Sequence, residues 1–325
     1  MTIPRTDARI RTVTAGVALA LAAVLLYFSL RGIQWREVAR IVAGASPGPL
    51  ALVLVIASAA LLLRACRWFV LLGGAARLRD VFWATAAGYF GNNFLPARAG
   101  ELVRTMMVSA RSGLDVPYVL ATALSERVSD ALVLVSIAAA VLLRLPAPPG
   151  WLANAIRPFA AVALIGVAAI ALLPLVASRV LALLDRLPFP DRFRAGVSRA
   201  VENALRGLRA FHDLRRLLMF LGLTAVIWTL DAAGVVAGAS ALGLEMSFPL
   251  AFLLIAALGL GSALPSTPGY VGIYQFVAVS VLTPFGFSRN DAIAYILVAQ
   301  ALGYVVIGFW GAIGLLRYRR SRTKT

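Results

Sequence analysis

The sequence has little cysteine and little histidine: among its 325 residues there is one cysteine, Cys66, and one histidine, His212. A disulfide framework needs cysteines in pairs, and a structural zinc site needs several Cys or His ligands. We therefore expect no internal disulfide, no metal and no cofactor. The motifs G-x-x-x-x-G-K-[ST], G-x-S-x-G and H-E-x-x-H are also absent. Their absence excludes an ATP-driven pump within this chain and argues against an enzyme.

Acidic residues are scarce too, with 14 Asp and Glu against 31 Lys and Arg and a net charge of +17. Nucleic-acid binding would require a basic face with interleaved aromatics. Here, apolar runs separate the arginines into short clusters, which is the positive-inside pattern of membrane proteins. The chain is 61% hydrophobic with a mean hydropathy of +0.88. We expect an all-α integral membrane protein and no nucleic-acid partner.

Apolar runs divide the chain, and a full membrane crossing needs about 20 apolar residues. Six runs are long enough, and the first of them is interpreted as an uncleaved span. Three runs are short, and each meets a Pro or Gly cluster, as discontinuous helices do. The long runs are 13–30, 49–72, 117–143, 156–177, 217–242 and 291–316, and the short ones are 81–96, 248–264 and 271–285.

The arginine distribution selects one topology. Nine arginines lie between 178 and 216, and the tail reads RYRRSRTKT, so both are predicted to be cytoplasmic. A full crossing by 81–96 would place the nine arginines outside. Two re-entrant broken hairpins, at about 81–112 and 248–285 and entering from opposite faces, remove the conflict. The pattern predicts one multi-pass domain over 1–325 with cytoplasmic termini, six full spans and, as a hypothesis, an inverted repeat.

The first polar stretch, NNFLPARAGELVR, lies where the run 81–96 ends. Pro96 stops the helix because its ring clashes with the preceding turn. Asn93 can then hydrogen-bond backbone groups that the break leaves free. Broken backbone at membrane depth is tolerated only inside protein or along a wet cavity.

The same stretch carries Arg98, Glu101 and Arg104. If a helix restarts near position 99, Glu101 and Arg104 share one face. Arg98 then lies at the helix start, where free N–H groups already favour an anion. An arginine fork beside such a terminus suits a phosphate. The alternative is a cytoplasmic interfacial loop with positive-inside arginines.

The second polar stretch, SERVSD at 125–130, lies inside the run 117–143. Unpaired charges within a span cost roughly 2.5–3.5 kcal/mol each on the insertion scale. Glu126 and Asp130 are four residues apart, and Arg127 and Asp130 are three apart, so the pairs can meet on one helix face. One interpretation is a substrate or proton site. The other is a structural ion pair that joins this helix to the first hairpin, and the two are compatible.

The third stretch, LPSTPGYVGIYQF at 264–276, contains Pro268 and Gly269, which break the helix, and then Tyr270 and Tyr274. A helix that starts near Gly269 would point its N–H groups toward the hairpin tip. The alternative is an ordinary proline kink.

A lone acid, Asp231, lies deep in the run 217–242. It is either a proton carrier or the partner of an arginine, and we favour the pairing because an isolated charge there is expensive. Glu126, Asp130 and Asp231 are the candidates for proton coupling.

These three stretches, in this order, resemble the lysylphosphatidylglycerol synthase transmembrane region, a family of flippase-like integral membrane proteins. The resemblance covers nearly the whole chain. It implies a multi-pass protein of the bacterial inner membrane that moves an anionic, aminoacylated or polyprenyl-linked lipid between leaflets. By motif match it implies a role in substrate binding for Asn93, Arg98, Glu101, Arg104, Glu126, Arg127, Asp130, Pro268 and Gly269, and we add Tyr270 and Tyr274.

The chain departs from the family pattern in two respects. Bifunctional members carry a soluble aminoacyl-transfer domain after the membrane region, whereas this sequence ends at RYRRSRTKT, so lysine transfer to lipid is not expected. Gln275 stands where many members carry an acid, which removes the basis for a proton role at that position.

The sequence thus predicts a flippase-like lipid transporter without catalytic activity, whose partner is a phospholipid or a polyprenyl-phosphate lipid. The alternative is a non-transporting subunit of envelope lipid or glycan synthesis that binds a lipid or an enzyme. A separate lipid-modifying enzyme or glycosyltransferase and a second copy of the chain are further partners to consider. A third hypothesis, an intramembrane transferase, would need Glu126 as its general base.

Overall fold

A computed structural model of the chain describes residues 5–94, 99–142, 190–208, 213–262 and 267–322, with isolated positions between 154 and 182. Every regular element in these ranges is helical, which confirms the predicted all-α class. The elements are α1 (Arg5–Leu30), α2 (Trp35–Ala43), α3 (Pro47–Leu71), α4 (Leu78–Phe94), α5 (Gly100–Ser112), α6 (Val116–Leu142), α8 (Asp191–Leu208), α9 (Leu214–Ala241), α10 (Phe248–Gly261), η3 (Pro268–Tyr270), α11 (Ile273–Leu282), η4 (Thr283–Phe285) and α12 (Arg289–Arg322).

The helix ends follow the local sequence. Pro47 occupies the first turn of α3, where its missing N–H is not needed. Gly113 ends α5 with a φ of 72°, a left-handed conformation that glycine adopts without strain. At the end of α1, Arg289 donates hydrogen bonds to the carbonyl oxygens of Phe28 (2.6 Å) and Ser29 (3.1 Å). These bonds cap α1 from the start of α12.

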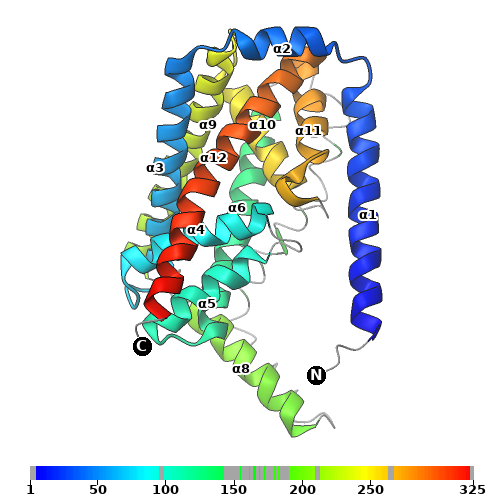
Figure 1. Cartoon of the computed structure of the whole chain (residues 1–325). Coiled ribbons are helices and arrows are strands. Elements are labelled where there is room, and N and C mark those ends of the chain that lie inside the picture. The colour runs from blue at the N-terminus through cyan, green and yellow to red at the C-terminus, as the bar shows by residue number, and fades with distance from the viewer. Residues whose placement is uncertain are drawn as a thin grey trace.

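The helices form an elongated bundle with both termini at the same end (Figure 1). The long helices α3, α9 and α12 run along the bundle, and α2 lies across its far end. The pair α4 and α5 occupies the half near the termini, and the pair α10 and α11 occupies the opposite half. Each pair reverses direction partway along the bundle. Their re-entry into a bilayer, the count of six spans and the inverted repeat stay predictions.

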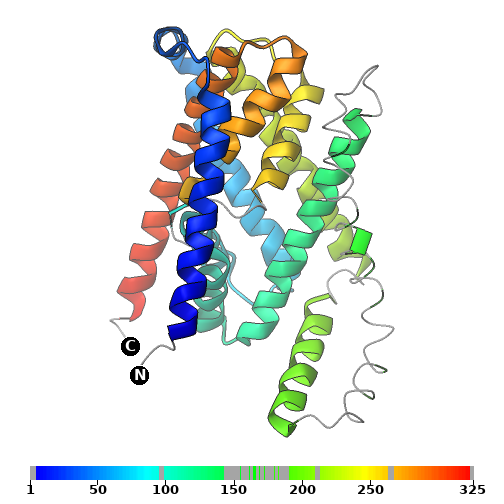
Figure 2. The ribbon, with the colours of Figure 1, turned by 90° about the vertical axis from the view of Figure 1, so that its right-hand side faces the viewer.

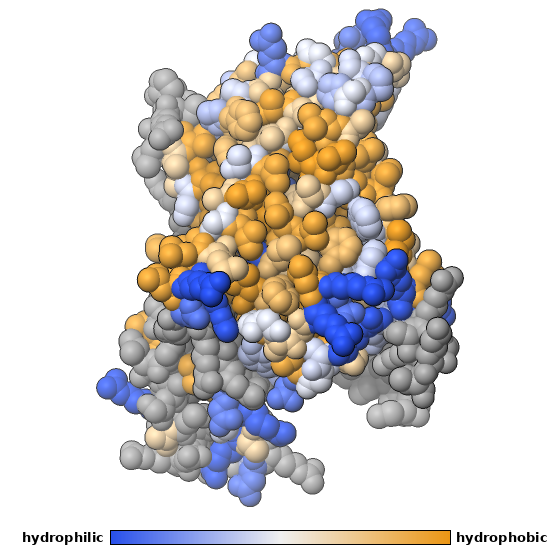
Figure 3. Space-filling model, turned by 90° about the vertical axis from the view of Figure 1, so that its left-hand side faces the viewer, coloured by the Kyte–Doolittle hydropathy of each residue, from blue (hydrophilic) through white to orange (hydrophobic). Residues whose placement is uncertain are grey.

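Within the described ranges, three helices are long and apolar enough to cross a membrane by length and composition: Pro47–Leu71, Leu214–Ala241 and Arg289–Arg319. Figure 3 shows the side of the bundle on which α3 lies, where hydrophobic residues fill a broad band and hydrophilic residues gather above and below it. Helix α6 has 27 residues, but SERVSD interrupts its apolar surface. The predicted span 156–177 lies outside the described ranges.

The predicted basic loop 178–216 contains a helix. Residues Asp191–Leu208 form α8, an 18-residue amphipathic helix that projects at the end where the termini lie (Figure 2). The sequence analysis missed it because the high arginine content suggested a solvated loop. Arginine is nevertheless a good helix former, and apolar residues recur along this segment at helical spacing.

Two buried cores lie one beyond the other along the bundle. Along α6, Ala123 belongs to the core around α4 and α5, and Leu134 belongs to the core around α10 and α11. Along α9, Phe220 and Ala232 are divided between the two cores in the same way. Glu126, Arg127 and Asp130 of α6 and Asp231 of α9 lie between these positions. The fold therefore places its charges where the two pairs of short helices approach each other.

Candidate functional site

The site begins with the close pairing of α4 and α5. A Cβ atom built on Gly100 would lie 1.9 Å from the carbonyl oxygen of Gly88 and 2.6 Å from the side-chain oxygen of Asn92. Only glycine permits this approach. The helix restarts at Gly100, as the sequence predicts, and the first turn presents Glu101 toward α6. The residues 95–98 that connect α4 to α5, including the predicted site residue Arg98, lie outside the described ranges.

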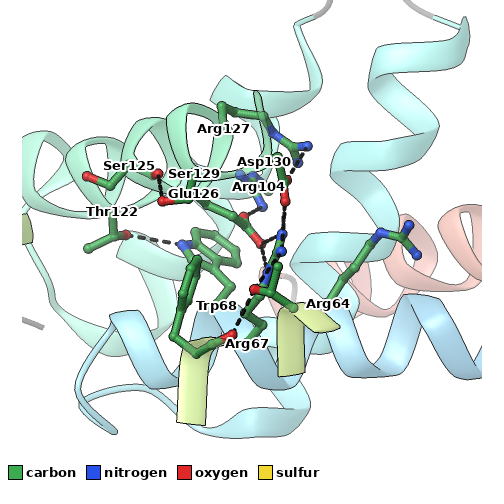
Figure 4. Close-up of polar contacts among 12 residues, drawn as sticks. Arg64, Arg67, Trp68, Arg104, Thr122, Ser125, Glu126, Arg127, Ser129 and Asp130 are labelled. Carbon is green, nitrogen blue, oxygen red and sulfur yellow. Dashed lines mark hydrogen bonds and ion pairs between the residues drawn. The ribbon is translucent and has the colours of Figure 1, made fainter. Parts of the chain in front are cut away.

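A buried carboxylate, Glu126 of α6, forms the centre of a charged cluster (Figure 4). Its Oε1 accepts hydrogen bonds from Nη2 (2.9 Å) and Nε (3.2 Å) of Arg67 on α3. Its Oε2 accepts one from Nη1 of Arg104 on α5 (2.8 Å). All three side chains are at most 2% exposed. A buried carboxylate held by two guanidinium groups joins three helices and stays ionised.

Arg104 is held by more than its ion pairs. Its Nε donates to Glu101 Oε2 at 2.6 Å, and its guanidinium carbon lies 4.4 Å from the ring centroid of Trp68. The Trp68 Nε1–H in turn donates to Thr122 Oγ1 at 3.1 Å. The cation–π contact compensates Arg104 Nη2, which makes no hydrogen bond within the described part of the chain. Arg104 is thus fixed inside the protein.

Two further carboxylates extend the cluster toward a cavity. Asp130 accepts hydrogen bonds from Arg67 Nη1 (2.7 Å) and Nη2 (2.9 Å) and lies 3.5 Å from Arg127 Nη1. Glu101 Oε1 accepts from Arg127 Nε at 2.9 Å and from Asn92 Nδ2 at 3.3 Å. The Arg127 side chain is 35% exposed, so its guanidinium is held from one side and open on the other.

A further ion pair of the charged cluster links α3 to α9. Arg64 donates a short hydrogen bond from Nη2 to Asp231 Oδ2, and the two side chains are 19% and 20% exposed. The Arg64 guanidinium carbon lies 5.9 Å from the ring centroid of Tyr89, and that of Arg127 lies 5.6 Å from the same ring. Tyr89 therefore places the two partly exposed guanidinium groups on one wall.

The second broken pair is stabilised by a network of amides. Gln275 Oε1 accepts from the N–H of Gly272 at 2.7 Å, and its Nε2 donates to Gln300 Oε1. Gln300 Nε2 donates to the carbonyl oxygen of Gly269 at 3.0 Å, and the Tyr304 hydroxyl donates to the same oxygen. Gln275 thus pairs a backbone N–H and a side-chain oxygen at the break, where an ionised acid could accept from Gly272 but would have no N–H to donate to Gln300.

The break itself presents an aromatic pair. Gly269 has a φ of 73°, and Tyr270 follows with a φ of 60°, which is uncommon for a side chain of this size. The rings of Tyr270 and Tyr274 stack with their centroids 4.9 Å apart and an interplanar angle of 9°. Helix α11 begins at Ile273, four residues after the predicted start near Gly269, because Gly269 and Gly272 both adopt positive φ.

These parts surround one cavity of about 950 Å³. Its charged end is formed by side chains of α3, α4, α5, α6 and α9, its aromatic side by Tyr270 and Tyr274, and its remaining wall mainly by apolar residues of α3, α9, α10 and α12. Eight predicted residues line it: Asn93, Glu101, Arg127, Asp130, Asp231, Gly269, Tyr270 and Tyr274.

Two predicted residues lie behind the cavity wall. Arg104 and Glu126 are buried in the ion-pair cluster and do not line the cavity. Arg104 donates from Nε to Glu101 and from Nη1 to Glu126, and its predicted role in substrate binding stays a prediction. Glu126 also cannot face an acceptor as a general base. Of Pro268, the structure describes the backbone within η3.

Sequence reasoning missed several residues of the site. Arg64 and Arg67 were not among the predicted site residues, although they pair with Asp231, Asp130 and Glu126. Their spacing of three was the available signal, because it places both on one face of an apolar helix. Two other missed residues line the cavity: Tyr89, and Tyr304, which also holds the broken helix.

Comparisons with known proteins agree with this architecture. The family model of the lysylphosphatidylglycerol synthase TM region matches residues 14–311. A protein of Haloferax volcanii named glycosyltransferase AglD is 29% identical over 95% of this chain, which spans 55% of that protein's length. A UPF0104 membrane protein of Methanothermobacter thermautotrophicus is 22% identical over 81% of each chain. The chain belongs to the lysylphosphatidylglycerol synthase TM region family of integral membrane proteins.

Proposed function

We propose that the chain binds a lipid with an anionic headgroup in this cavity and moves it between the two leaflets of the membrane. The observation that carries the proposal is the cavity's division into a charged end and a mainly apolar wall. A phospholipid or a polyprenyl phosphate has the same division between its headgroup and its chain. The phosphate would lie against Arg64 and Arg127, and the adjoining part of the lipid's hydrocarbon chain would lie along α9, α10 and α12.

The exposure of the arginines supports Arg64 and Arg127 as the residues that bind the headgroup. Arg67 and Arg104 have side chains that are 2% exposed and bound to carboxylates. Arg127 is 35% exposed, and Arg64 is 19% exposed; both line the cavity. A guanidinium group held on one side by carboxylates is oriented to bind phosphate with its remaining donors.

The placement of the short helices supports transport rather than simple binding. The pair α4–α5 enters the bundle from one end and α10–α11 from the other (Figure 1), and both contribute residues to the same cavity. Discontinuous helices that meet at a central site are characteristic of transporters with alternating access.

A second candidate function has its own support. The eight described charges of the cluster are four arginines and four carboxylates, so the cluster is neutral without a ligand. A glycosyltransferase-named relative suggests glycan synthesis as the setting. The chain would then hold a lipid or lipid-linked substrate for a separate enzyme without moving it between leaflets.

Leaflet exchange in proteoliposomes separates these candidates. The full chain is reconstituted with fluorescent phosphatidylglycerol, and dithionite quenching reports exchange. We expect wild type to accelerate exchange and Arg127→Ala to reduce the rate about tenfold or more, because a charge-assisted hydrogen bond contributes about 1.5–3 kcal/mol. Arg40→Ala, which removes the exposed pair with Glu37, is the matched control.

Equal background rates for wild type and Arg127→Ala would contradict transport. Saturable lipid binding that needs Arg127 but is not accompanied by exchange would favour the non-transporting subunit. Arg98→Ala tests in the same assay whether the predicted residue between α4 and α5 contributes to the headgroup site.

A further inference from the structure

The four described carboxylates of the site differ in how many cations hold them. Glu126 contacts Arg67 and Arg104, Glu101 contacts Arg104 and Arg127, and Asp130 contacts Arg67 and Arg127. Within the described residues, Asp231 has one cationic partner, Arg64, and both side chains line the cavity. A ligand anion that takes the Arg64 Nη2 donor in place of Asp231 would leave this carboxylate without a cationic partner among the described residues.

The total charge of the site determines what happens to the displaced carboxylate. Because four arginines face four carboxylates among the described residues, their formal charges sum to zero before the ligand binds. An anionic headgroup adds one negative charge beside largely apolar walls. An unpaired charge in such surroundings is expensive, and a displaced carboxylate relieves the cost by binding a proton.

We propose that Asp231 is a proton-exchange site, at which an anionic headgroup takes Arg64 and the released carboxylate binds one proton from water. The balance is one lipid anion and one proton entering together, with no other bond formed or broken. This inference rests on the proposed function, since it requires the headgroup to bind at Arg64. It makes lipid binding electroneutral and gives a proton gradient a route to drive transport.

The surroundings of Asp231 single it out for this role. It extends from α9, which packs against α3, α10 and α12. Among the described residues lining the cavity, α3 contributes Arg64, α12 contributes Tyr295 and Tyr304, and α10 contributes no ionisable group. The charged or ionisable groups across the cavity are Tyr89, Glu101, Arg127, Asp130, Tyr270 and Tyr274. Both acids among them are held by two arginines each, so Asp231 is the carboxylate that ligand binding can free.

Calorimetry can count the proton. Full-length protein in detergent is titrated with short-chain phosphatidylglycerol, whose phosphodiester stays ionised, in buffers of different ionisation enthalpy between pH 5 and pH 8. We expect wild type to take up about one proton per lipid in part of this range. Affinity should rise as pH falls there, by up to about tenfold per pH unit, because one bound proton is linked to one bound lipid.

Asp231→Asn should bind the lipid without proton uptake and with an affinity independent of pH. If this variant fails to fold, Arg64→Gln/Asp231→Asn preserves charge balance and should show weaker binding, again without uptake. Glu37→Gln, at the exposed pair with Arg40, should retain the wild-type proton count.

The outcomes separate this inference from the proposed function. Lipid binding by wild type with no proton uptake at any pH would overturn the proton site alone, and so would uptake that persists in Asp231→Asn. Absence of lipid binding by folded wild type would overturn the proposed function, and the proton site with it.

Discussion

Gly100 approaches Gly88 so closely that a Cβ atom at position 100 would lie 1.9 Å from the Gly88 carbonyl oxygen. The contact is between backbones, so no side-chain rotation can relieve it. We expect Gly100→Ala to separate α4 from α5 and lower stability by at least about 1–3 kcal/mol, the usual cost of overpacking. Thermal unfolding in detergent measures the effect.

The matched control is Gly222→Ala in α9, where a Cβ atom meets nothing within 4 Å. This change should be neutral or slightly stabilising, because alanine favours helix. Equal melting temperatures for Gly100→Ala and wild type would contradict the close pairing of α4 with α5.

Removal of the central carboxylate should be among the most destabilising single changes in the cluster. Glu126→Gln leaves Arg67 and Arg104 buried with less negative charge to hold them. Breaking a buried ion pair on one side typically costs about 3–5 kcal/mol. Melting temperature and the yield of monodisperse protein report the loss.

A double variant tests whether that loss is electrostatic. Arg104→Gln/Glu126→Gln removes one charge of each sign and should recover part of the stability lost in Glu126→Gln. Glu37→Gln, at a solvent-exposed pair, should cost no more than about 1 kcal/mol. A Glu126→Gln protein as stable as Glu37→Gln would show that the cluster does not hold the three helices together.

The amide network at the second break should also contribute measurably to the stability of the protein. Gln275→Leu has a similar size but leaves the N–H of Gly272 and the side-chain oxygen of Gln300 without their present partners. Each unsatisfied buried group costs about 1–3 kcal/mol, so we expect a clear fall in melting temperature. Ser240→Ala, whose exposed hydroxyl bonds to its own helix, is the control and should be nearly neutral.

Cysteine labelling tests the predicted topology. Cys66 is the one native cysteine, so a Cys66→Ala background permits single reporters at Arg111 and Pro284, both exposed. We expect a membrane-impermeant maleimide to label Arg111→Cys from the cytoplasmic side and Pro284→Cys from the outer side. Labelling of position 111 from outside and of position 284 from inside would overturn the two re-entrant hairpins.

Hydropathy and helix breakers predicted the helical elements closely, because both act through local sequence. The run 248–264 became α10 (Phe248–Gly261), and the restart near position 99 became α5. The partners of the charged residues could not be predicted in the same way. Arg67 is 59 residues from Glu126 along the chain, and Arg64 is 167 from Asp231. Such pairings depend on how helices pack, which no local pattern specifies.

The site was partly predictable for the same reason. Charged residues inside apolar runs stand out because placing a charge within a membrane span costs free energy. This argument predicted Arg127, Asp130 and Asp231 as site residues. Whether such a residue faces a cavity or a neighbouring helix depends on side-chain direction after packing. Arg104 and Glu126 belong to the second kind, and only the three-dimensional arrangement distinguishes them from Arg127.

Helix α12 touches both broken pairs. Near its middle, Gln300 and Tyr304 hold the carbonyl oxygen of Gly269, and further along, a Cβ atom at Gly311 would lie 2.4 Å from the Cβ of Phe90 on α4. Because α12 is one continuous helix in contact with both pairs, a tilt of α12 would displace both pairs together. Opening at one end of the bundle would then be mechanically tied to closing at the other.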